Sequence, residues 1–304
     1  MSKQAEKAKS ERIEYGSHER FSPYGIMASY GLSAKKSLGQ NFLNDMTVVR
    51  RIVDAADVGP EDLVLEVGPG LGVMTEVLSE RAGYVAAIEI DRDLAPVLEP
   101  IAAAKPNIGI VFDDVMRVNI RRLVEEIRAA HPELVRVRVV ANLPYYITTP
   151  IIMMFLEQNA GLFDSLTFMV QKEVAERLVS EPDGDAYGAI TIAVAYYSEA
   201  SIRFTVPASC FVPRPKVDSA VVNLAIYKER PVEPRDRGHM FRLVKAAFAQ
   251  RRKMLVNALS NAQYLGVGKD EAAAAIAELG LVPKVRGEAL SVADFARLSD
   301  LLVR

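Results

Sequence analysis

Short apolar runs alternate with amphipathic segments between residues 48 and 170, and this alternation limits the possible folds more than any other feature of the chain. The runs are nearly continuous in hydrophobic residues, which predicts strands buried on both faces, as in a parallel sheet. The predicted strands are Leu63–Val67, Val85–Ile90, Ile108–Phe112, Val137–Ala141 and Leu166–Val170. Between them, Met74–Arg81 and Ile120–Ala130 have helical spacing. Repeated strand–helix units predict an open α/β sheet that binds ligands at the carboxyl ends of its strands.

The chain changes character after Tyr227. Before that point, residues 187–198 fit either a strand by propensity or a helix by length, and Ser201–Val206 and Ser219–Tyr227 could pair as an antiparallel hairpin. Beyond it, two prolines and six charges between 228 and 236 indicate a linker, and a helical pattern then continues to the end. We therefore expect a disordered tail over 1–34, a catalytic domain over 35–228 and a helical domain over 229–304.

Cysteine and histidine usage argues against metal and disulfide chemistry. Cys210 is the only cysteine, and the three histidines, at 18, 131 and 239, lie far apart, so we predict no disulfide framework and no metal site. The first twenty residues are polar and lack the apolar core of a secretory signal. No apolar run reaches the roughly 18 residues of a membrane helix. These features predict a cytoplasmic protein without a membrane partner.

The net charge of −2 conceals an uneven distribution. Residues 1–40 carry +3, residues 41–227 carry −10, and residues 228–304 carry +5. This pattern excludes a uniformly basic nucleic-acid binder but allows basic ends that hold a polyanion.

A glycine-rich turn follows the first predicted strand. The strand LVLEV, with Glu66 near its end, leads directly into Gly68-Pro69-Gly70-Leu71-Gly72 and then a helix. Glycines allow the backbone to approach a ligand closely, and the helix start offers free N–H groups. The dinucleotide pattern G-x-G-x-x-G is not met, because its sixth position holds Val73 or Thr75. The turn therefore favours a nucleoside ligand without phosphates, with a tight strand–helix connection as the alternative.

Acidic residues end the next two strands as well. Glu89 lies twenty-one residues after Gly68, where an acid can accept hydrogen bonds from both ribose hydroxyls. Asp113 and Asp114 end the third strand, where a carboxylate could bind an adenine amino group. Three successive acidic strand ends would also suit a ligand with a cationic centre.

The fourth strand ends in Asn142-Leu143-Pro144-Tyr145, a set suited to a planar base that carries an amino group. Proline makes the turn rigid, asparagine supplies an acceptor, and tyrosine supplies a flat face. The N6 nitrogen of adenine is a poor nucleophile because its lone pair is delocalised into the ring. Hydrogen bonds from its two N–H groups to the Asn142 oxygen and the Leu143 carbonyl would favour a pyramidal nitrogen aimed at a methyl donor. The alternative is a capped turn with a core tyrosine.

These motifs resemble the class I S-adenosylmethionine-dependent methyltransferases of the ribosomal RNA adenine N6-dimethyltransferase family. The resemblance extends over roughly residues 35–302. It implies a Rossmann-like, mostly parallel seven-stranded sheet with a small all-α C-terminal domain. Six segments in order carry it: Gly39–Leu43, Glu66–Gly72, Ile88–Asp91, Asn142–Tyr145, Phe211–Ser219 and Ala247–Lys253.

The resemblance also implies a role for individual residues. Around the cofactor S-adenosyl-L-methionine, Gln40, Asn41 and Leu43 would close over it, and Glu66 would lie at the mouth of its site. Gly68 and Gly70 would pass beneath its methionine part, and Glu89 would bind its ribose. Asp114 and Val115 would bind its adenine, and Asn142 would also contact the cofactor. Those assigned to the target base are Asn142 and Leu143, which orient its amino group, Pro144, and Tyr145 and Phe211, which stack on it.

Two branches of the family differ in their RNA target. One dimethylates two adjacent adenines in the 3′-terminal hairpin of small-subunit rRNA, and the other modifies one large-subunit adenine and gives macrolide resistance. Pro150 and the QRRK at 250–253 resemble the small-subunit type, whereas Tyr146 replaces a small or amide residue that is common there. The resemblance thus implies a monomeric enzyme that acts on 16S rRNA in a pre-30S particle, with the large-subunit enzyme as the alternative.

A basic stretch in the C-terminal part fits this target. From Arg237 to Lys269 there are seven Lys or Arg residues and no acidic residue. Helical spacing places Arg242, Lys245 and Lys253 together, opposite an apolar face, so the basic face could meet phosphates. The residues predicted to bind RNA are Lys35, Lys36, Arg242, Lys245, Arg251, Arg252 and Lys253. A solvated basic face is the alternative.

Three other functions are disfavoured. The glycine spacing argues against an NAD(P) oxidoreductase. DNA adenine and protein glutamine methyltransferases usually carry proline where this chain has Leu143. An assembly factor without catalysis would be expected to lose part of the acidic set or of the Asn142–Tyr145 turn, and both are intact, although an assembly role could coexist with catalysis.

Overall fold

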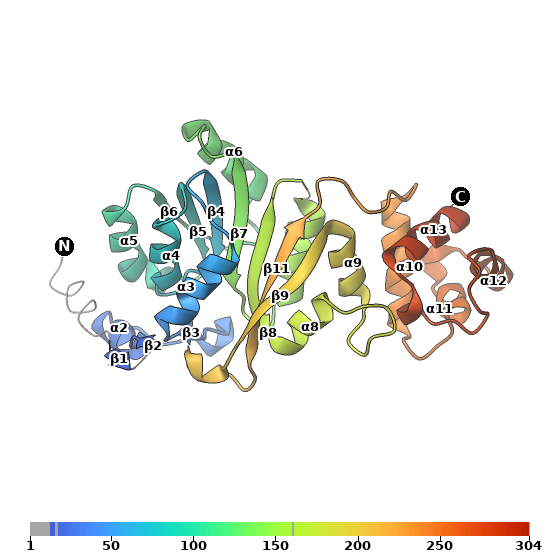
Figure 1. Ribbon diagram of the computed structural model, residues 1–304, viewed down its shortest axis with the longest axis horizontal. Coiled ribbons are helices and arrows are strands. Elements are labelled where there is room, and N and C mark those ends of the chain that lie inside the picture. The colour runs from blue at the N-terminus through green and yellow to red at the C-terminus, as the bar shows by residue number, and fades with distance from the viewer. Residues whose placement is uncertain (1–12, 16–17, 160, 304) are drawn as a thin grey trace. The chain divides into compact units, whose positions relative to one another are not determined.

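The computed structural model describes residues 13–15, 18–159 and 161–303. The chain forms two compact units (Figure 1). The first contains the residues up to 175 together with 201–226, and the second contains 176–200 together with 227–304. The chain thus enters the second unit for the last time after residue 226, close to the change of character noted at 228.

A seven-stranded sheet forms the centre of the first unit. Its strands are β4 (Asp62–Val67), β5 (Tyr84–Glu89), β6 (Ile108–Phe112), β7 (Arg136–Asn142), β8 (Ser165–Gln171), β9 (Ser198–Val206) and β11 (Ser219–Ile226). Their order is β6–β5–β4–β7–β8–β11–β9; the pairs among β4 to β8 are parallel, and β11 is antiparallel to β8. The five predicted parallel strands are confirmed to within two residues, and β9 and β11 are hydrogen-bonded neighbours as expected. The open, mostly parallel α/β sheet is therefore confirmed.

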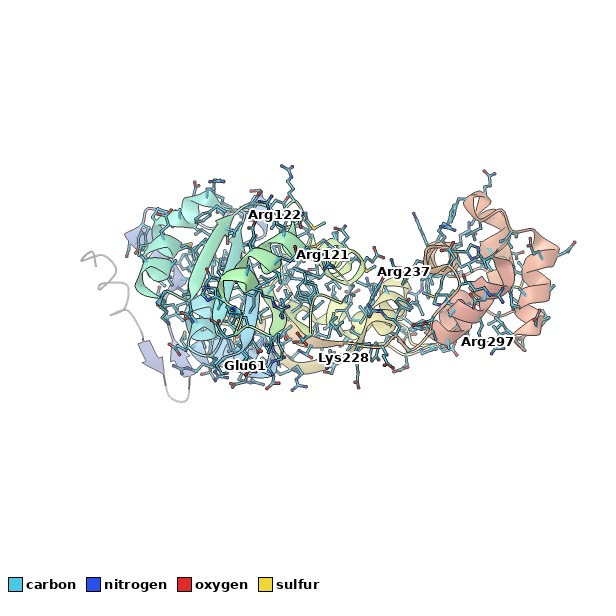
Figure 2. All side chains as sticks on the ribbon, turned by 90° about the horizontal axis from the view of Figure 1, so that it is seen from above. Glu61, Arg121, Arg122, Lys228, Arg237 and Arg297 are labelled. Atoms are coloured by element: carbon cyan, nitrogen blue, oxygen red, sulfur yellow. The ribbon has the colours of Figure 1, made fainter. Side chains whose placement is uncertain are left out.

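The connections between the strands are mainly helical. The helices along this part of the chain are α2 (Pro23–Ser29), α3 (Met46–Ala55), α4 (Val73–Ser79), α5 (Ala95–Ala104), α6 (Ile120–Ala130), α7 (Thr148–Met153) and α8 (Lys172–Leu178), and a π-helical turn follows α7 over Met154–Gln158. Helix α6 has the predicted bounds, with Ile120 and Val124 buried and Arg121 and Arg122 on its exposed side (Figure 2). Such one-sided burial is what the helical spacing indicates.

The N-terminal segment is more ordered than expected. The expectation of disorder over 1–34 falls partly on residues 1–12 and 16–17, which lie outside the described residues. Farther on, β1 (Ile13–Tyr15) pairs with β2 (His18–Arg20), and α2 begins after Ser22, whose hydroxyl accepts a hydrogen bond from the Gly25 N–H at 3.0 Å. Met27 is buried beside Phe42 and other apolar side chains. The expectation of disorder is therefore wrong for residues 21–34, because Met27 contributes to a core that the isolated segment does not reveal.

The second unit is helical. Its helices are α9 (Ala189–Tyr197), α10 (Arg237–Ala249), α11 (Leu255–Asn261), α12 (Lys269–Glu278) and α13 (Val292–Leu302). The ambiguous residues 187–198 form α9, whose Tyr197 ring stacks on Phe241 of α10 at a centroid distance of 6.1 Å. Helix α9 is buried on most sides, which explains why it lacks the polar face of an ordinary surface helix. Residues 176–200 therefore group with the C-terminal helices rather than with the catalytic domain, to which the sequence assigned them.

No helix within the described part of the chain is long and apolar enough to cross a membrane.

Candidate active site

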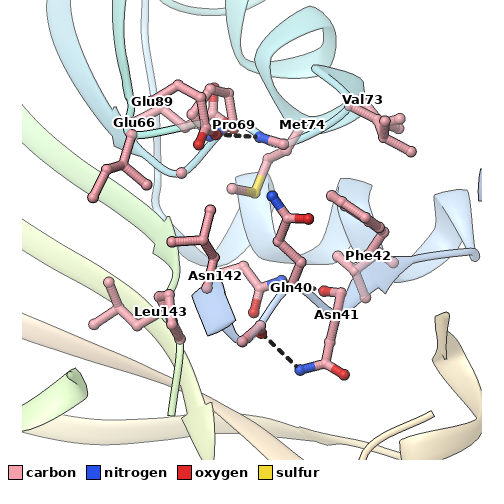
Figure 3. Close-up of a pocket in the computed structure, with 18 of the residues that line it drawn as sticks. Gln40, Asn41, Phe42, Glu66, Pro69, Val73, Met74, Glu89, Asn142 and Leu143 are labelled. Carbon is pink, nitrogen blue, oxygen red and sulfur yellow. Dashed lines mark hydrogen bonds between the residues drawn. The ribbon is translucent and has the colours of Figure 1, made fainter. Parts of the chain in front are cut away.

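Three polar side chains meet at one edge of the central sheet. Because β4, β5 and β7 run parallel, their carboxyl ends bring Glu66, Glu89 and Asn142 to the same side. All three line one pocket of about 920 Å³, which includes its part open to solvent (Figure 3).

The glycine-rich turn forms the floor of this pocket. Gly68 and Gly70 both line it and have positive φ angles of 69° and 59°, a backbone region that glycine enters without steric cost. No atom lies within 4 Å of the place where a Cβ of Gly68 would stand. At Gly70 a Cβ would lie 3.0 Å from the ring of Phe42, so glycine is needed there for backbone conformation and for space.

Glu66 is a buried acid that makes no ion pair with any described residue. Its side chain is fully buried, and neither carboxyl oxygen accepts a hydrogen bond from any residue that the structure describes. Burial raises its pKa to about 8, the neighbouring Thr75 hydroxyl opposes part of the increase, and the nearby charge of Glu89 adds to it. An uncompensated acid that borders a pocket is suited to a cationic ligand, because a positive group would replace the hydration that burial removes.

Glu89 is held in place by two backbone donors. The N–H of Asp91 donates to its Oε1 at 2.8 Å, and the N–H of Gly70 donates to its Oε2 at 3.1 Å. Burial raises the pKa of this carboxyl as well. Each Glu89 oxygen keeps a second acceptor position, so the carboxyl group can still accept hydrogen bonds from the two hydroxyls of a ribose.

All four residues of the Asn142–Tyr145 turn line the same pocket. The Pro144 carbonyl accepts hydrogen bonds from the Ile147 N–H at 3.2 Å and from the Thr148 hydroxyl at 3.0 Å. The Tyr145 hydroxyl lies 2.8 Å from that of Ser219. These bonds fix the turn, as a rigid proline-containing connection requires.

Residues 35–43, called here the cofactor loop, cover the pocket. Gln40, Asn41 and Leu43 all line it, and the contacts with the cofactor that the resemblance implies for them stay predictions. Leu43 belongs to the short strand β3 (Phe42–Leu43), which pairs with β10 (Phe211–Val212). The Asn142 side-chain nitrogen donates to the Asn41 carbonyl at 3.1 Å, which leaves the Asn142 oxygen as the end available to accept hydrogen bonds from an amino group.

Three residues predicted for the site do not line this pocket. Asp114 and Val115 follow β6, which neighbours β5, but Val115 is buried and Asp114 Oδ1 accepts a hydrogen bond from the Met116 N–H. Phe211 is 2% exposed and packs in the hydrophobic core beside Leu43. Their roles toward adenine and the target base stay predictions.

The predicted RNA-binding residues have different environments. Lys36 is exposed, whereas Lys35 lies 2.6 Å from carboxylate oxygens of both Asp91 and Asp93, so its charge is neutralised locally. The structure thus gives no support to Lys35 as part of a free basic surface.

The C-terminal basic residues are exposed, but they do not share one helix. Helix α10 ends at Ala249 and Lys253 lies in the following turn, which the sequence did not indicate because no glycine or proline interrupts it. Arg242 faces Asp236 at 3.6 Å, and Arg251 donates to the Asp185 carbonyl at 3.1 Å. Lys245, Arg252 and Lys253 make no ion pair with other described residues.

Sequence reasoning missed several residues of the site. Phe21, Phe42, Val73 and Met74 supply much of the apolar lining. Phe42 lies within the Gly39–Leu43 motif and could have been inferred from it. Phe21 stands alone in a polar segment, so nothing in the sequence marks it.

Helices alternating with a mostly parallel sheet, and a pocket at the carboxyl ends that carries two buried acids and a glycine turn, define a class I methyltransferase. A family model described as ribosomal RNA adenine dimethylase matches residues 31–303. The chain belongs to this family and is therefore a methyltransferase that uses S-adenosyl-L-methionine.

Individual relatives agree with this assignment. The "Ribosomal RNA small subunit methyltransferase A" of Lachnoclostridium phytofermentans is 43% identical over 278 residues, which cover 91% of this chain and 94% of that protein. Among solved structures, a dimethyladenosine transferase from Plasmodium falciparum gives a TM-score of 0.72 at 24% identity, covering 84% of this chain and 95% of the other. The 23S rRNA methyltransferase ErmE gives a TM-score of 0.65 at 25% identity, covering 86% of this chain and 100% of the other.

The residues present fit S-adenosyl-L-methionine. Glu66 offers an uncompensated carboxyl to a ligand that carries a sulfonium and an ammonium group, and the open side of Gly68 leaves room for its chain. The role of Glu89 toward its ribose stays a prediction. Bound there, the cofactor supplies an activated methyl group.

The protein's own contribution to the chemistry is then orientation of the acceptor. The Asn142 Oδ1 and the Leu143 carbonyl can each accept one N–H of an adenine N6 amino group, which favours a pyramidal nitrogen with an available lone pair. No strong general base is required, because the proton can leave after transfer. Within the described residues, no group of three or more His, Cys, Asp or Glu side chains could hold a metal ion.

Proposed function

We propose that this chain is the small-subunit enzyme of its family, which transfers methyl groups to N6 of two adjacent adenines in the 3′-terminal hairpin of 16S rRNA. The similarity to relatives carries this choice of subunit. Relatives named "Ribosomal RNA small subunit methyltransferase A" are 42–45% identical, whereas the 23S rRNA methyltransferase ErmE is 25% identical. The Asn142–Tyr145 turn, which faces the same pocket as Glu66 and Glu89, supports the chemistry.

The second unit is proposed to bind the RNA. Its exposed Lys245, Arg252 and Lys253 offer positive charge that no described partner neutralises, and Arg242 and Arg251 add to it. Arg237 on α10 and Arg297 on α13 are further exposed basic side chains of this unit (Figure 2). Contacts of this kind to phosphates give affinity without sequence specificity, so the choice of adenine rests with the pocket.

The experiment is to incubate the protein with methyl-labelled S-adenosyl-L-methionine and with small subunits that lack the modification. The labelled nucleotides are then mapped by nuclease digestion and mass spectrometry. Dimethylated adenine at two adjacent positions in the 3′-terminal hairpin is expected. Large subunits and fully methylated small subunits serve as controls, and label on large-subunit rRNA alone would contradict the proposal.

A further inference from the structure

Asp91, just after β5, is hydrogen-bonded to the cofactor loop. Its carboxyl is 4% exposed and accepts hydrogen bonds from Lys35 Nζ at 2.6 Å and from Gln40 Nε2 at 2.8 Å. The Gln40 Oε1 accepts the backbone N–H of Lys35 at 2.8 Å. Lys35, Gln40 and Asp91, called here the clasp, therefore form a closed set of hydrogen bonds between segments more than fifty residues apart.

Asp91 also acts on the opposite side of the pocket, through its backbone. Its N–H donates to Glu89, the acid placed for the ribose. The side chain and the backbone of one residue thus hold both the cofactor loop and this carboxylate. Burial alone would raise the pKa of Asp91, but the hydrogen bonds from Lys35 and Gln40 outweigh burial and keep that pKa below its ordinary value.

The cofactor loop also contacts Asn142 and Tyr146. The Asn41 carbonyl accepts the Asn142 amide, and a Cβ at Gly39 would lie 3.3 Å from the ring of Tyr146. Gly39 itself has a φ of 63°. The loop therefore packs closely against residues 142–146, and because Asn41 directly follows Gln40 of the clasp, a displacement of Gln40 would be transmitted to Asn142.

We propose that Asp91 is a positioning residue for methyl transfer, which acts through the clasp to hold the cofactor loop against both the methyl donor and Asn142. Gln40 then serves the cofactor indirectly, because both ends of its amide are engaged within the protein. This inference deepens the proposed function, but its first readout, cofactor affinity, requires no RNA.

Asp91→Asn and Asp93→Asn form a matched pair of variants. Both carboxylates lie 2.6 Å from Lys35 Nζ, but Asp93 is 66% exposed and has no bond to Gln40. An exposed ion pair contributes little, so Asp93→Asn is expected to change the Kd for S-adenosyl-L-methionine by less than about twofold. Loss of the buried, charge-assisted bonds in Asp91→Asn is expected to raise that Kd by about tenfold or more.

Kinetics and stability separate positioning from a merely structural role. Asp91→Asn is expected to raise the KM for S-adenosyl-L-methionine and lower kcat, while the KM for small subunits stays unchanged. Adding Gln40→Ala to Asp91→Asn is expected to cause little further loss, because both changes open the same clasp. If Asp91→Asn fails to fold, Gln40→Ala alone tests one arm of the clasp.

A lowered melting temperature without cofactor, combined with an unchanged Kd and KM for the cofactor, would overturn the proposal. Equal effects of the two aspartate variants would also overturn it. If wild-type protein binds the cofactor through the clasp but does not methylate small subunits, the proposed function fails and the clasp stands.

Discussion

The Asn142 side-chain amide donates a hydrogen bond to the backbone carbonyl of Asn41 at 3.1 Å, although the two residues are 101 positions apart. This bond decides which end of the amide faces the substrate side. With the nitrogen engaged by the cofactor loop, the oxygen is left to accept an N–H from adenine. The loop over the cofactor and the group that orients the acceptor are therefore directly joined.

Replacement of Asn142 by alanine is expected to abolish methylation and leave RNA binding mostly intact. The variant lacks the acceptor that favours a pyramidal N6, whereas the exposed basic residues of the second unit are untouched. Methyl incorporation into unmodified small subunits and a filter-binding Kd measure the two properties. Near-normal turnover in this variant would contradict the mechanism.

Phe211 is expected to matter strongly for stability. Because the ring is 2% exposed and packs in the core, Phe211→Ala is expected to lower the free energy of unfolding by about 3–5 kcal/mol. Phe211→Leu keeps more of the volume and should cost about 1–2 kcal/mol. Tyr146→Ala, at a ring that is 62% exposed, is a control expected to stay within about 0.5 kcal/mol.

Urea unfolding of the three variants measures these differences. Unchanged stability in Phe211→Ala would show that the ring is not a core residue in solution. The kcat of the stably folded Phe211→Leu variant measures stacking on the base separately from packing.

Much of the site could be predicted from the sequence because of the way a parallel sheet is built. Glu66, Glu89 and Asn142 each end a strand, and parallel strands place these ends at one edge, so local patterns were enough to bring them together. The strands themselves were identified because runs buried on both faces are continuous in apolar residues.

The remaining features depend on partners that are distant in sequence. The sequence around Lys35 predicts a free surface charge, because its partner Asp91 is fifty-six residues away in the chain. The burial of Phe211 could not be predicted from its own segment, because it depends on the pairing of β3 with β10. The burial of α9 depends on α10, and its β-branched residues alone favour a strand. No local pattern contains this information.

Glu66 is expected to make stability depend on pH in a specific direction. Its pKa in the folded protein is about 8, above the value of 4.5 for an ordinary glutamate. Between these values the folded state keeps the proton and the unfolded state releases it, so stability falls as the pH rises. The contribution is fully present below pH 4.5 and lost above about pH 8, at about 1.4 kcal/mol for each pH unit.

The comparison with Glu66→Gln isolates this effect, because glutamine keeps the shape of the neutral acid. The free energy of unfolding is measured at pH 6, 7 and 8 for both proteins without cofactor. The wild type is expected to lose stability relative to the variant across this range. Parallel curves for the two proteins would show that Glu66 is ionised in the folded state.

Binding of S-adenosyl-L-methionine is expected to release a proton from Glu66 near neutral pH. A cationic ligand beside the carboxyl favours its charged form and lowers its pKa. Calorimetric titrations at pH 7 in buffers of different ionisation enthalpy count the protons released. Release should be smaller in Glu66→Gln, and identical counts in both proteins would remove Glu66 from the cofactor's charged groups.

Neutralising Arg251, Arg252 and Lys253 together with glutamine is expected to weaken RNA binding and reduce its dependence on salt. Each phosphate contact that is lost should reduce the slope of log Kd against log salt concentration by about 0.7–0.9. Arg251 already donates to the Asp185 carbonyl and faces Glu288 at 3.6 Å, so Arg252 and Lys253 should account for most of the change. Single variants at the three positions test whether Arg252 and Lys253 contribute more than Arg251.

A control variant removes two charges from the first unit instead. Arg121 and Arg122 lie on the exposed side of α6, and Arg122 is paired with Glu126 at 2.7 Å. Replacing both with glutamine removes two positive charges, against three in the test variant, but it should leave the slope nearly unchanged because α6 is not assigned to the RNA. A slope that falls equally in both variants would show that total charge, rather than the stretch 251–253, governs the interaction.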